Sequence, residues 1–155
     1  MNRLIIALCF VSIISSGCAN KLQRASIPMG ITFVESTIEG LITLESTGFG
    51  PTTQAAELDA IREAFAAIMF EGIPQYTGLN RPFISNASTF EKSHPGFLDA
   101  FMGKGTFNQF VATSFPATVI GKVAKGKGVS KQLTINYKNF RTHLEQKGVI
   151  RKFGY

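Results

Sequence analysis

Apolar and polar positions alternate over one short stretch of the chain, from Ile38 to Ser46. One face of this stretch carries Ile38, Ile42 and Leu44, and the other carries Glu39, Thr43 and Glu45. A period of two residues is typical of a β-strand that buries one face. The run Gly48-Phe49-Gly50-Pro51 ends the pattern, because glycine and proline favour turns. We therefore predict a strand whose Ile42 side faces a core.

The next segment has the period of an amphipathic helix, which Thr52 or Thr53 can cap and which runs to about Phe70. Its predicted apolar face carries Leu58, Ile61, Phe65, Ile68 and Met69, and its predicted solvent face carries Asp59, Arg62 and Glu63. Beside the apolar face runs a strip of small residues, Ala56, Ala60, Ala64 and Ala67, which suits close packing on a sheet. Gly72 and Pro74 end the helix.

Residues 72–96 are rich in Gly, Pro, Asn and Ser, so we predict a long ordered loop. A short helical turn is expected over residues 95–102, behind a cap at Ser93. A strand is expected from Phe107 to Phe115.

The clearest hairpin joins predicted strands at residues 117–124 and 129–137 through the glycine-containing turn 125–128. After it, Asn139 is expected to cap a short helix that carries Phe140 and Leu144 on one face and ends at Gly148. This order of elements predicts a single small α+β domain over residues 31–155. Its sheet would be mainly antiparallel, with one long and one or two short helices packed on one face.

The N-terminal residues have the layout of a secretory signal peptide over positions 1–17. A positive start, Met1-Asn2-Arg3, precedes the apolar run Leu4–Ile14, and the small residues Ser15-Ser16-Gly17 follow it. The eleven apolar residues span only about 16 Å as a helix, too little to cross a hydrocarbon core of about 30 Å. A buried helix would need an amphipathic period, which this run lacks.

The sequence Ser15-Ser16-Gly17-Cys18 resembles the lipobox of bacterial lipoproteins. That resemblance implies a diacylglycerol thioether on Cys18, cleavage before it, and acylation of the new N-terminus. Ser15 stands where the lipobox usually has Leu, and small residues at Ser15 and Gly17 also suit ordinary secretory cleavage, so that alternative stays open. In the mature chain Cys18 would be the only thiol, because Cys9 leaves with the signal peptide.

Lipidation at Cys18 would make residues 18–30 a flexible tether to a membrane. Ala19 follows the cysteine where Asp would favour inner-membrane retention, so the resemblance implies the outer membrane. Lys21 and Arg24 stand where surface-exported lipoproteins of some phyla have an acidic run. We therefore expect a domain that faces the periplasm.

The composition, 45% hydrophobic and 17% charged over 155 residues, excludes a disordered chain and suits one domain. The net charge of +6 is unevenly distributed: residues 121–155 carry nine basic residues and one acid, and residues 18–120 carry six basic residues and nine acids. We expect one cationic face, built from the hairpin tip and the last helix, that attracts an envelope protein or anionic lipid. Its candidate residues are Lys122, Lys125, Lys127, Lys131, Arg141, Arg151 and Lys152. A Lys-rich edge that serves only solubility is the alternative, and no nucleic-acid-binding motif is present.

Seven of the fourteen phenylalanines lie between Phe83 and Phe115, where they form either core or an exposed docking patch. We identify no catalytic residue, metal site or cofactor motif: His94 and His143 are not spaced as metal ligands, and no nucleophile elbow occurs. The expected function is therefore that of an outer-membrane-anchored, non-enzymatic binding or assembly module. The alternative is an envelope enzyme that acts on glycan or lipid, with loop carboxylates such as Glu91 and Asp99.

Overall fold

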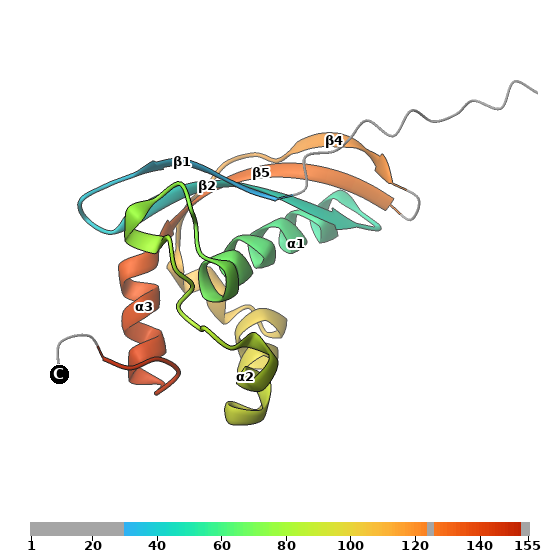
Figure 1. Cartoon of the computed structure of the whole chain (residues 1–155). Coiled ribbons are helices and arrows are strands. Elements are labelled where there is room, and N and C mark those ends of the chain that lie inside the picture. The colour runs from blue at the N-terminus through green and yellow to red at the C-terminus, as the bar shows by residue number, and fades with distance from the viewer. Residues whose placement is uncertain (1–29, 124–125, 153–155) are drawn as a thin grey trace, which may run out of the picture.

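An antiparallel sheet of five strands forms one layer of the molecule, and the helices lie on one side of it (Figure 1). The computed structural model describes residues 30–123 and 126–152, so the predicted signal peptide and tether, with Cys18, and Lys125 in the hairpin turn lie outside the described residues. The strands are β1 (Ile31–Ser36), β2 (Leu41–Gly50), β3 (Val111–Ser114), β4 (Thr118–Val123) and β5 (Gly126–Asn136). This architecture confirms the predicted α+β class.

The last strand, β5, is central in the sheet. It pairs with β2 along its whole length, from Leu41↔Asn136 to Gly50↔Lys127. On its other side β4 pairs with the first half of β5 and β3 with the second half. The predicted hairpin is therefore confirmed as β4 and β5, and β1 completes the sheet beside β2.

The predicted alternation in β2 is confirmed for Ile42 and Leu44, which are fully buried under the helices. The predicted start of the strand is wrong, because residues 37–40 form a turn in which Gly40 has a φ of 88°. Ile38 is fully exposed in that turn rather than part of the apolar face. The strand β1, which precedes the turn, was not predicted.

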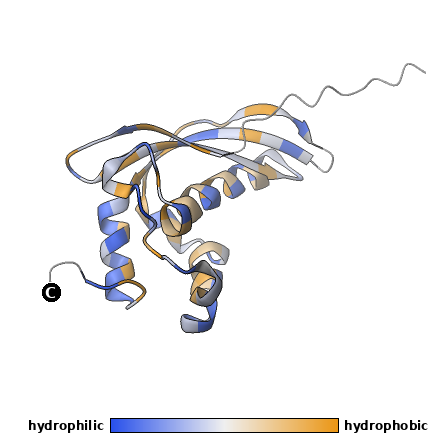
Figure 2. Ribbon diagram, in the orientation of Figure 1, coloured by the Kyte–Doolittle hydropathy of each residue, from blue (hydrophilic) through white to orange (hydrophobic). Residues whose placement is uncertain are grey.

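The long helix α1 (Thr53–Ala66) begins as predicted, with the Thr52 hydroxyl accepting from Ala55 N at 3.1 Å, and continues as a π-helical turn (Ala67–Glu71). The predicted small-residue strip lies flat on β2 and β5, and all four of its alanines are buried. The helix approaches β2 so closely that a Cβ on Gly48 would lie 2.2 Å from Ala56 O. Figure 2 shows apolar residues through α1 and the turn that follows it.

The predicted faces of α1 need two corrections. Leu58 is exposed rather than part of the core, because the sheet contacts the alanine strip beside it. Asp59 and Arg62 are half-buried rather than solvent-facing, and both make tertiary contacts. Asp59 Oδ2 accepts from Phe49 N at 2.8 Å, and Arg62 Nε donates to Met102 O at 3.1 Å.

The region predicted as a long loop contains more helix than expected. After a 3₁₀ turn (Thr77–Leu79) comes α2 (Ala87–Ser93). Asn86 is its N-cap, and Ser93 is its last residue rather than a cap. A π-helical turn (Asp99–Gly103) falls near the predicted short helix, and a 3₁₀ turn (Thr106–Phe110) occupies the first half of the strand predicted from Phe107. Only the short strand β3 remains of that prediction.

The last helix, α3 (Tyr137–Gln146), begins three residues earlier than predicted, because Asn136 rather than Asn139 is its cap. Its apolar face is confirmed: Phe140 and Leu144 are fully buried. Phe140 enters an aromatic core in which its ring centroid lies 5.2 Å from that of Phe65 and 5.1 Å from that of Phe101. Within residues 30–123 and 126–152, no helix has the length and apolar character needed to cross a membrane.

Candidate functional site

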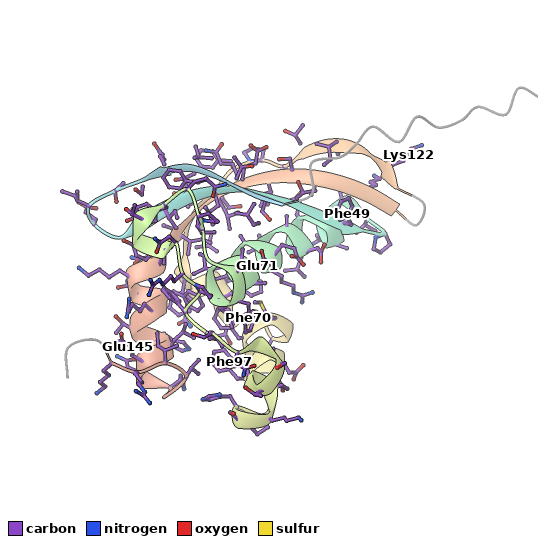
Figure 3. All side chains as sticks on the ribbon, in the orientation of Figure 1. Phe49, Phe70, Glu71, Phe97, Lys122 and Glu145 are labelled. Atoms are coloured by element: carbon purple, nitrogen blue, oxygen red, sulfur yellow. The ribbon has the colours of Figure 1, made fainter. Side chains whose placement is uncertain are left out.

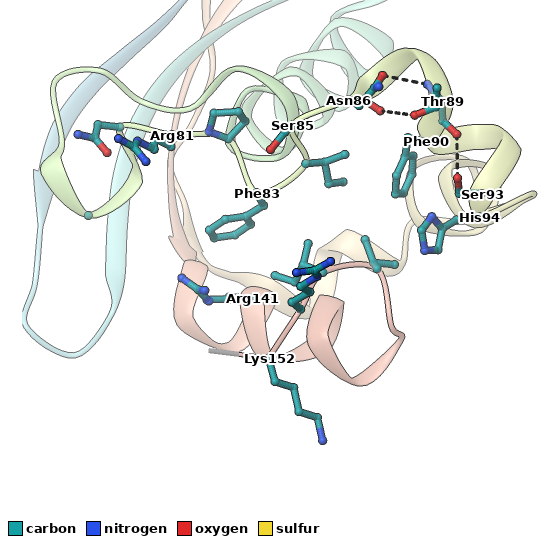
Figure 4. Close-up of a pocket in the computed structure, with 17 residues that line it drawn as sticks. Arg81, Phe83, Ser85, Asn86, Thr89, Phe90, Ser93, His94, Arg141 and Lys152 are labelled. Carbon is teal, nitrogen blue, oxygen red and sulfur yellow. Dashed lines mark hydrogen bonds between the residues drawn. The ribbon is translucent and has the colours of Figure 1, made fainter. Parts of the chain in front are cut away.

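A cleft of about 800 Å³ opens at the helical end of the molecule, between residues 78–94 and the segment that follows α3 (Figure 4). One wall consists of the loop after the 3₁₀ turn and of α2. The other wall consists of Arg141 and residues 149–152. The two walls are about 50 or more residues apart in the sequence, so tertiary contacts alone create the cleft.

Backbone hydrogen bonds fix the loop wall against the end of the long helix. Ile84 N donates to Met69 O at 2.8 Å, and Phe83 N donates to Ile68 O at 3.3 Å. The pairs place Ile84 in the core, with a relative exposure of 8%, and leave Phe83 half-buried beneath the cleft. The wall is therefore a positioned segment with fixed backbone partners.

The C-terminal wall turns back on α3. Gly148 has a φ of 69°, which suits glycine at the end of a helix, and Val149 N donates to Leu144 O at 2.9 Å. Two contacts then join this wall to the first. His94 Nε2 lies 3.3 Å from Gly148 O, and the Arg141 guanidinium lies 5.6 Å from the centre of the Phe83 ring. The cleft is consequently held in shape from both sides.

The polar lining of the cleft is cationic. Its basic side chains are Arg81, Arg141, Arg151 and Lys152, and no aspartate or glutamate is among the described residues that line it. Arg141 pairs with Glu145, with Nε 3.0 Å from the carboxylate oxygen. Arg81, Arg151 and Lys152 are exposed and form no ion pair with any residue that the structure describes. Among the described residues, three of the four cations of the cleft therefore have no carboxylate partner.

Aromatic and aliphatic side chains lie beneath these charges. Phe90 and Ile84 are buried, whereas Phe83, Val149 and Ile150 are half-buried. The His94 ring stacks on Phe90 at 4.9 Å, and its Nδ1 atom is buried without a hydrogen-bond partner among the described atoms. A ligand of this cleft would meet separate cations at the rim and a small apolar area below.

The seven candidate basic residues do not form one face. Arg141, Arg151 and Lys152 line the cleft, whereas Lys122 and Lys127 are exposed at the tip of the β4–β5 hairpin. The eleven residues of β5 separate the two groups by about 35 Å. Figure 3 shows the same separation, with Lys122 and Glu145 at opposite ends of the molecule.

Lys131 is not on the surface at all. It has a relative exposure of 5%, and its Nζ lies 3.0 Å from Glu57 Oε2 and 2.9 Å from Phe115 O. Its side chain joins β5 to α1 and to the segment after β3. Lys131 and Glu57 therefore form a structural ion pair, and the Lys131 ammonium is unavailable to a ligand.

Sequence reasoning missed Arg81, which supplies the cation of the opposite wall. It is a lone basic residue in a Gly-, Pro- and Asn-rich stretch, outside the basic C-terminal segment, so charge counting gave no signal for it. The only local indication is its position between Asn80 and Pro82, which is typical of an ordered turn.

The other candidate groups lie away from the cleft. Glu91 and Asp99 are exposed, do not line it, and are not gathered in one pocket, and Glu91 accepts from Gly96 N at 3.0 Å. His143 packs on Phe110, and burial and the neighbouring Lys147 lower its pKa. No group of three His, Cys, Asp or Glu side chains suited to a metal ion occurs in the part of the chain that the structure describes.

The phenylalanine-rich region is mainly core. Of its seven rings, four are buried, Phe83 and Phe97 are half-buried, and Phe115 is exposed. The buried members are Phe90, Phe101, Phe107 and Phe110. Only Phe83 and Phe90 line the cleft, and the region as a whole is core and not an apolar docking patch.

Comparison of the chain with protein-family models, with curated proteins and with solved structures finds no match.

Proposed function

We propose that this protein is an outer-membrane-anchored, periplasm-facing lipoprotein that acts as a non-enzymatic binding module, and that the cationic cleft is its binding site. One observation supports the cleft as the binding site. Two segments that are distant in the sequence bring four basic side chains to one opening, and no described carboxylate lines it. Three of these side chains are exposed and unpaired among the described residues. Such a site attracts a negatively charged partner.

The anchor is the second half of the proposal, and it follows from the sequence around Cys18. Cells grown with a radioactive fatty acid should label the wild-type chain and not the Cys18→Ser variant. Equal labelling of both would contradict the lipoprotein assignment. It would leave the cleft as a binding site of a secreted protein.

Site-specific photo-crosslinking in cells tests the cleft. Asn80 lines it and is exposed, so a photoreactive residue at position 80 should give a defined adduct. The matched position is Thr32, which is exposed on the opposite side of the sheet and should not give that adduct.

The adduct at position 80 should be lost in an Arg81→Glu/Arg151→Glu background, because two of the three exposed cations of the cleft are then reversed. It should persist in a Lys122→Glu/Lys127→Glu background, which changes the net charge equally at the hairpin tip. An adduct that depends on neither pair, or that forms equally at position 32, would contradict binding at the cleft.

A further inference from the structure

We propose that the ligand of the cleft is an acidic, extended peptide segment of a partner protein, with an apolar side chain among its carboxylates. This inference rests on the proposed binding function and names the chemical class of the partner. Four features of the cleft support it: the distribution of its charges, the limited size of its apolar area, the hydroxyl groups on its α2 wall, and its position relative to the start of the domain.

The basic side chains are spread along the cleft and do not converge on one point. In Figure 4, Arg81 and Arg141 come from opposite walls, and Lys152 extends away from the other labelled side chains at the mouth. A single phosphate is best held by donors that meet at one place. Separated cations suit several separated anions, as an acidic peptide provides.

The apolar area suits one or two side chains. Ile84 and Phe90 are already buried by the protein's own packing. The lining residues that keep exposed apolar surface are Pro82, Phe83, Val149 and Ile150. Among the described residues this is the whole half-buried apolar surface of the cleft, which is too little to shield an acyl chain from water, so it does not favour a lipid. It matches a single Phe or Leu of a peptide.

Hydroxyl groups on the α2 wall complement the cations. The Ser93 hydroxyl donates to Thr89 O at 3.2 Å, which leaves its oxygen lone pairs to accept. The Thr89 hydroxyl likewise donates to Asn86 O at 3.5 Å. A peptide backbone supplies N–H donors for such acceptors, whereas arginine and lysine only donate.

The cleft also lies far from the point where the described chain begins. Gly30 adjoins β1 in the sheet layer. The segments that line the cleft, α2 and the chain after α3, lie on the helical side below that layer (Figure 1). A domain tethered through the segment before Gly30 can therefore present the cleft away from its own membrane. That position favours a protein partner over the lipid headgroups beside the anchor.

Fluorescence anisotropy on the full-length protein in non-ionic detergent tests the inference. The probe is a fluorescein-labelled peptide of sequence Glu-Asp-Glu-Phe-Glu-Asp-Leu-Glu, and a peptide with Lys at every acidic position is its control. Dioctanoyl phosphatidylglycerol, which is water-soluble and anionic, serves as the lipid competitor. We expect the acidic peptide to bind and neither of the other two to bind or compete.

The charge-reversal pairs then locate the site. Arg81→Glu/Arg151→Glu should weaken binding of the acidic peptide about tenfold or more, whereas Lys122→Glu/Lys127→Glu should weaken it less than about twofold. All four residues are exposed, so folding should be retained, and circular dichroism checks this.

Absence of peptide binding would overturn the inference. If the phosphatidylglycerol binds instead and depends on Arg81 and Arg151, the ligand class is wrong and the cleft stays a binding site. If both charge-reversal pairs weaken peptide binding equally, the cleft itself is wrong, and the proposed function fails with it.

Discussion

At the scale of single residues, the absence of one side chain determines how closely the helix and sheet approach. Gly48 in β2 lies directly under α1, and a Cβ there would be 2.2 Å from Ala56 O and from Ala60 N. Both atoms belong to the helix backbone, which cannot rotate away. The alanine strip of α1 and Gly48 therefore form one close contact, made from small residues on both sides.

The Gly48→Ala variant should lose about 3 kcal/mol of unfolding free energy, because the helix must move off the sheet. Urea denaturation measures the loss. Gly128→Ala is the matched control: its Cβ would meet the Phe49 ring at 3.2 Å, where a side chain can shift, and it should cost less than about 1 kcal/mol. Similar losses in both variants would contradict this account of the contact.

A second residue-scale feature predicts a dependence of stability on pH. The hydroxyls of Tyr76 and Tyr137 lie 2.9 Å apart, and burial together with this hydrogen bond raises the pKa of Tyr137 to about 12. Below a pH of about 10 the Tyr137 phenol is protonated in the folded and unfolded chains alike, so the stabilisation from its hydrogen bond to Tyr76 is fully present. Between about 10 and 12 only the unfolded chain releases the proton, so stability falls as the pH rises.

We expect the unfolding free energy of the wild type to fall more steeply than that of Tyr137→Phe over this range. Tyr76→Phe, which keeps Tyr137 but removes its partner, should lie between them. Urea denaturation at a series of pH values, with tyrosinate absorbance as a parallel readout, checks the order. Parallel curves for the wild type and Tyr137→Phe would contradict the assignment.

At the scale of elements, hydrophobic periodicity predicted the long helix and the hairpin, whose patterns repeat, and missed the short elements β1 and α2. The helix α1 and the β4–β5 hairpin repeat their pattern over ten residues or more. In β1 a bulge between Phe33 and Glu35 breaks the alternation, so its pattern is too short to detect. The seven residues of α2 include one large apolar side chain, Phe90, and a single apolar residue cannot show a helical period.

The ring of Phe140 is the largest buried side chain by which α3 packs on the core. Phe140 is fully buried and lies within 5.3 Å of Phe65, Phe101 and Phe110, measured between ring centroids. Phe140→Ala should cost about 3–5 kcal/mol and loosen α3 together with the C-terminal wall of the cleft.

Hydrogen exchange should therefore rise in α3 more than in the β2–β5 pair, and binding of the acidic peptide should weaken although every cleft residue is present. Phe140→Leu keeps most of the contact area and should preserve binding. Uniform exchange over the whole domain in Phe140→Ala would show instead that α3 unfolds only with the sheet.

At the scale of the whole molecule, the candidate site could be predicted only in part. Charge along the chain identified Arg141, Arg151 and Lys152, because they lie in one basic segment. It could not identify Arg81, which joins them through tertiary contacts. It also placed Lys131 among the surface cations, since its partner Glu57 is 74 residues away and no local pattern connects them.

The central position of β5 has a consequence for the order of events during synthesis. Its partners β2, β3 and β4 all precede it in the chain, and Leu41 pairs with Asn136, so the sheet cannot close until the last strand exists. Until then Ile42 and Leu44 have β1 on one side but lack the neighbouring strand on the other. Such high contact order slows folding, and the growing chain must stay soluble without its core. Assembly of the sheet therefore waits for a single strand, β5, which is made after all four of the others.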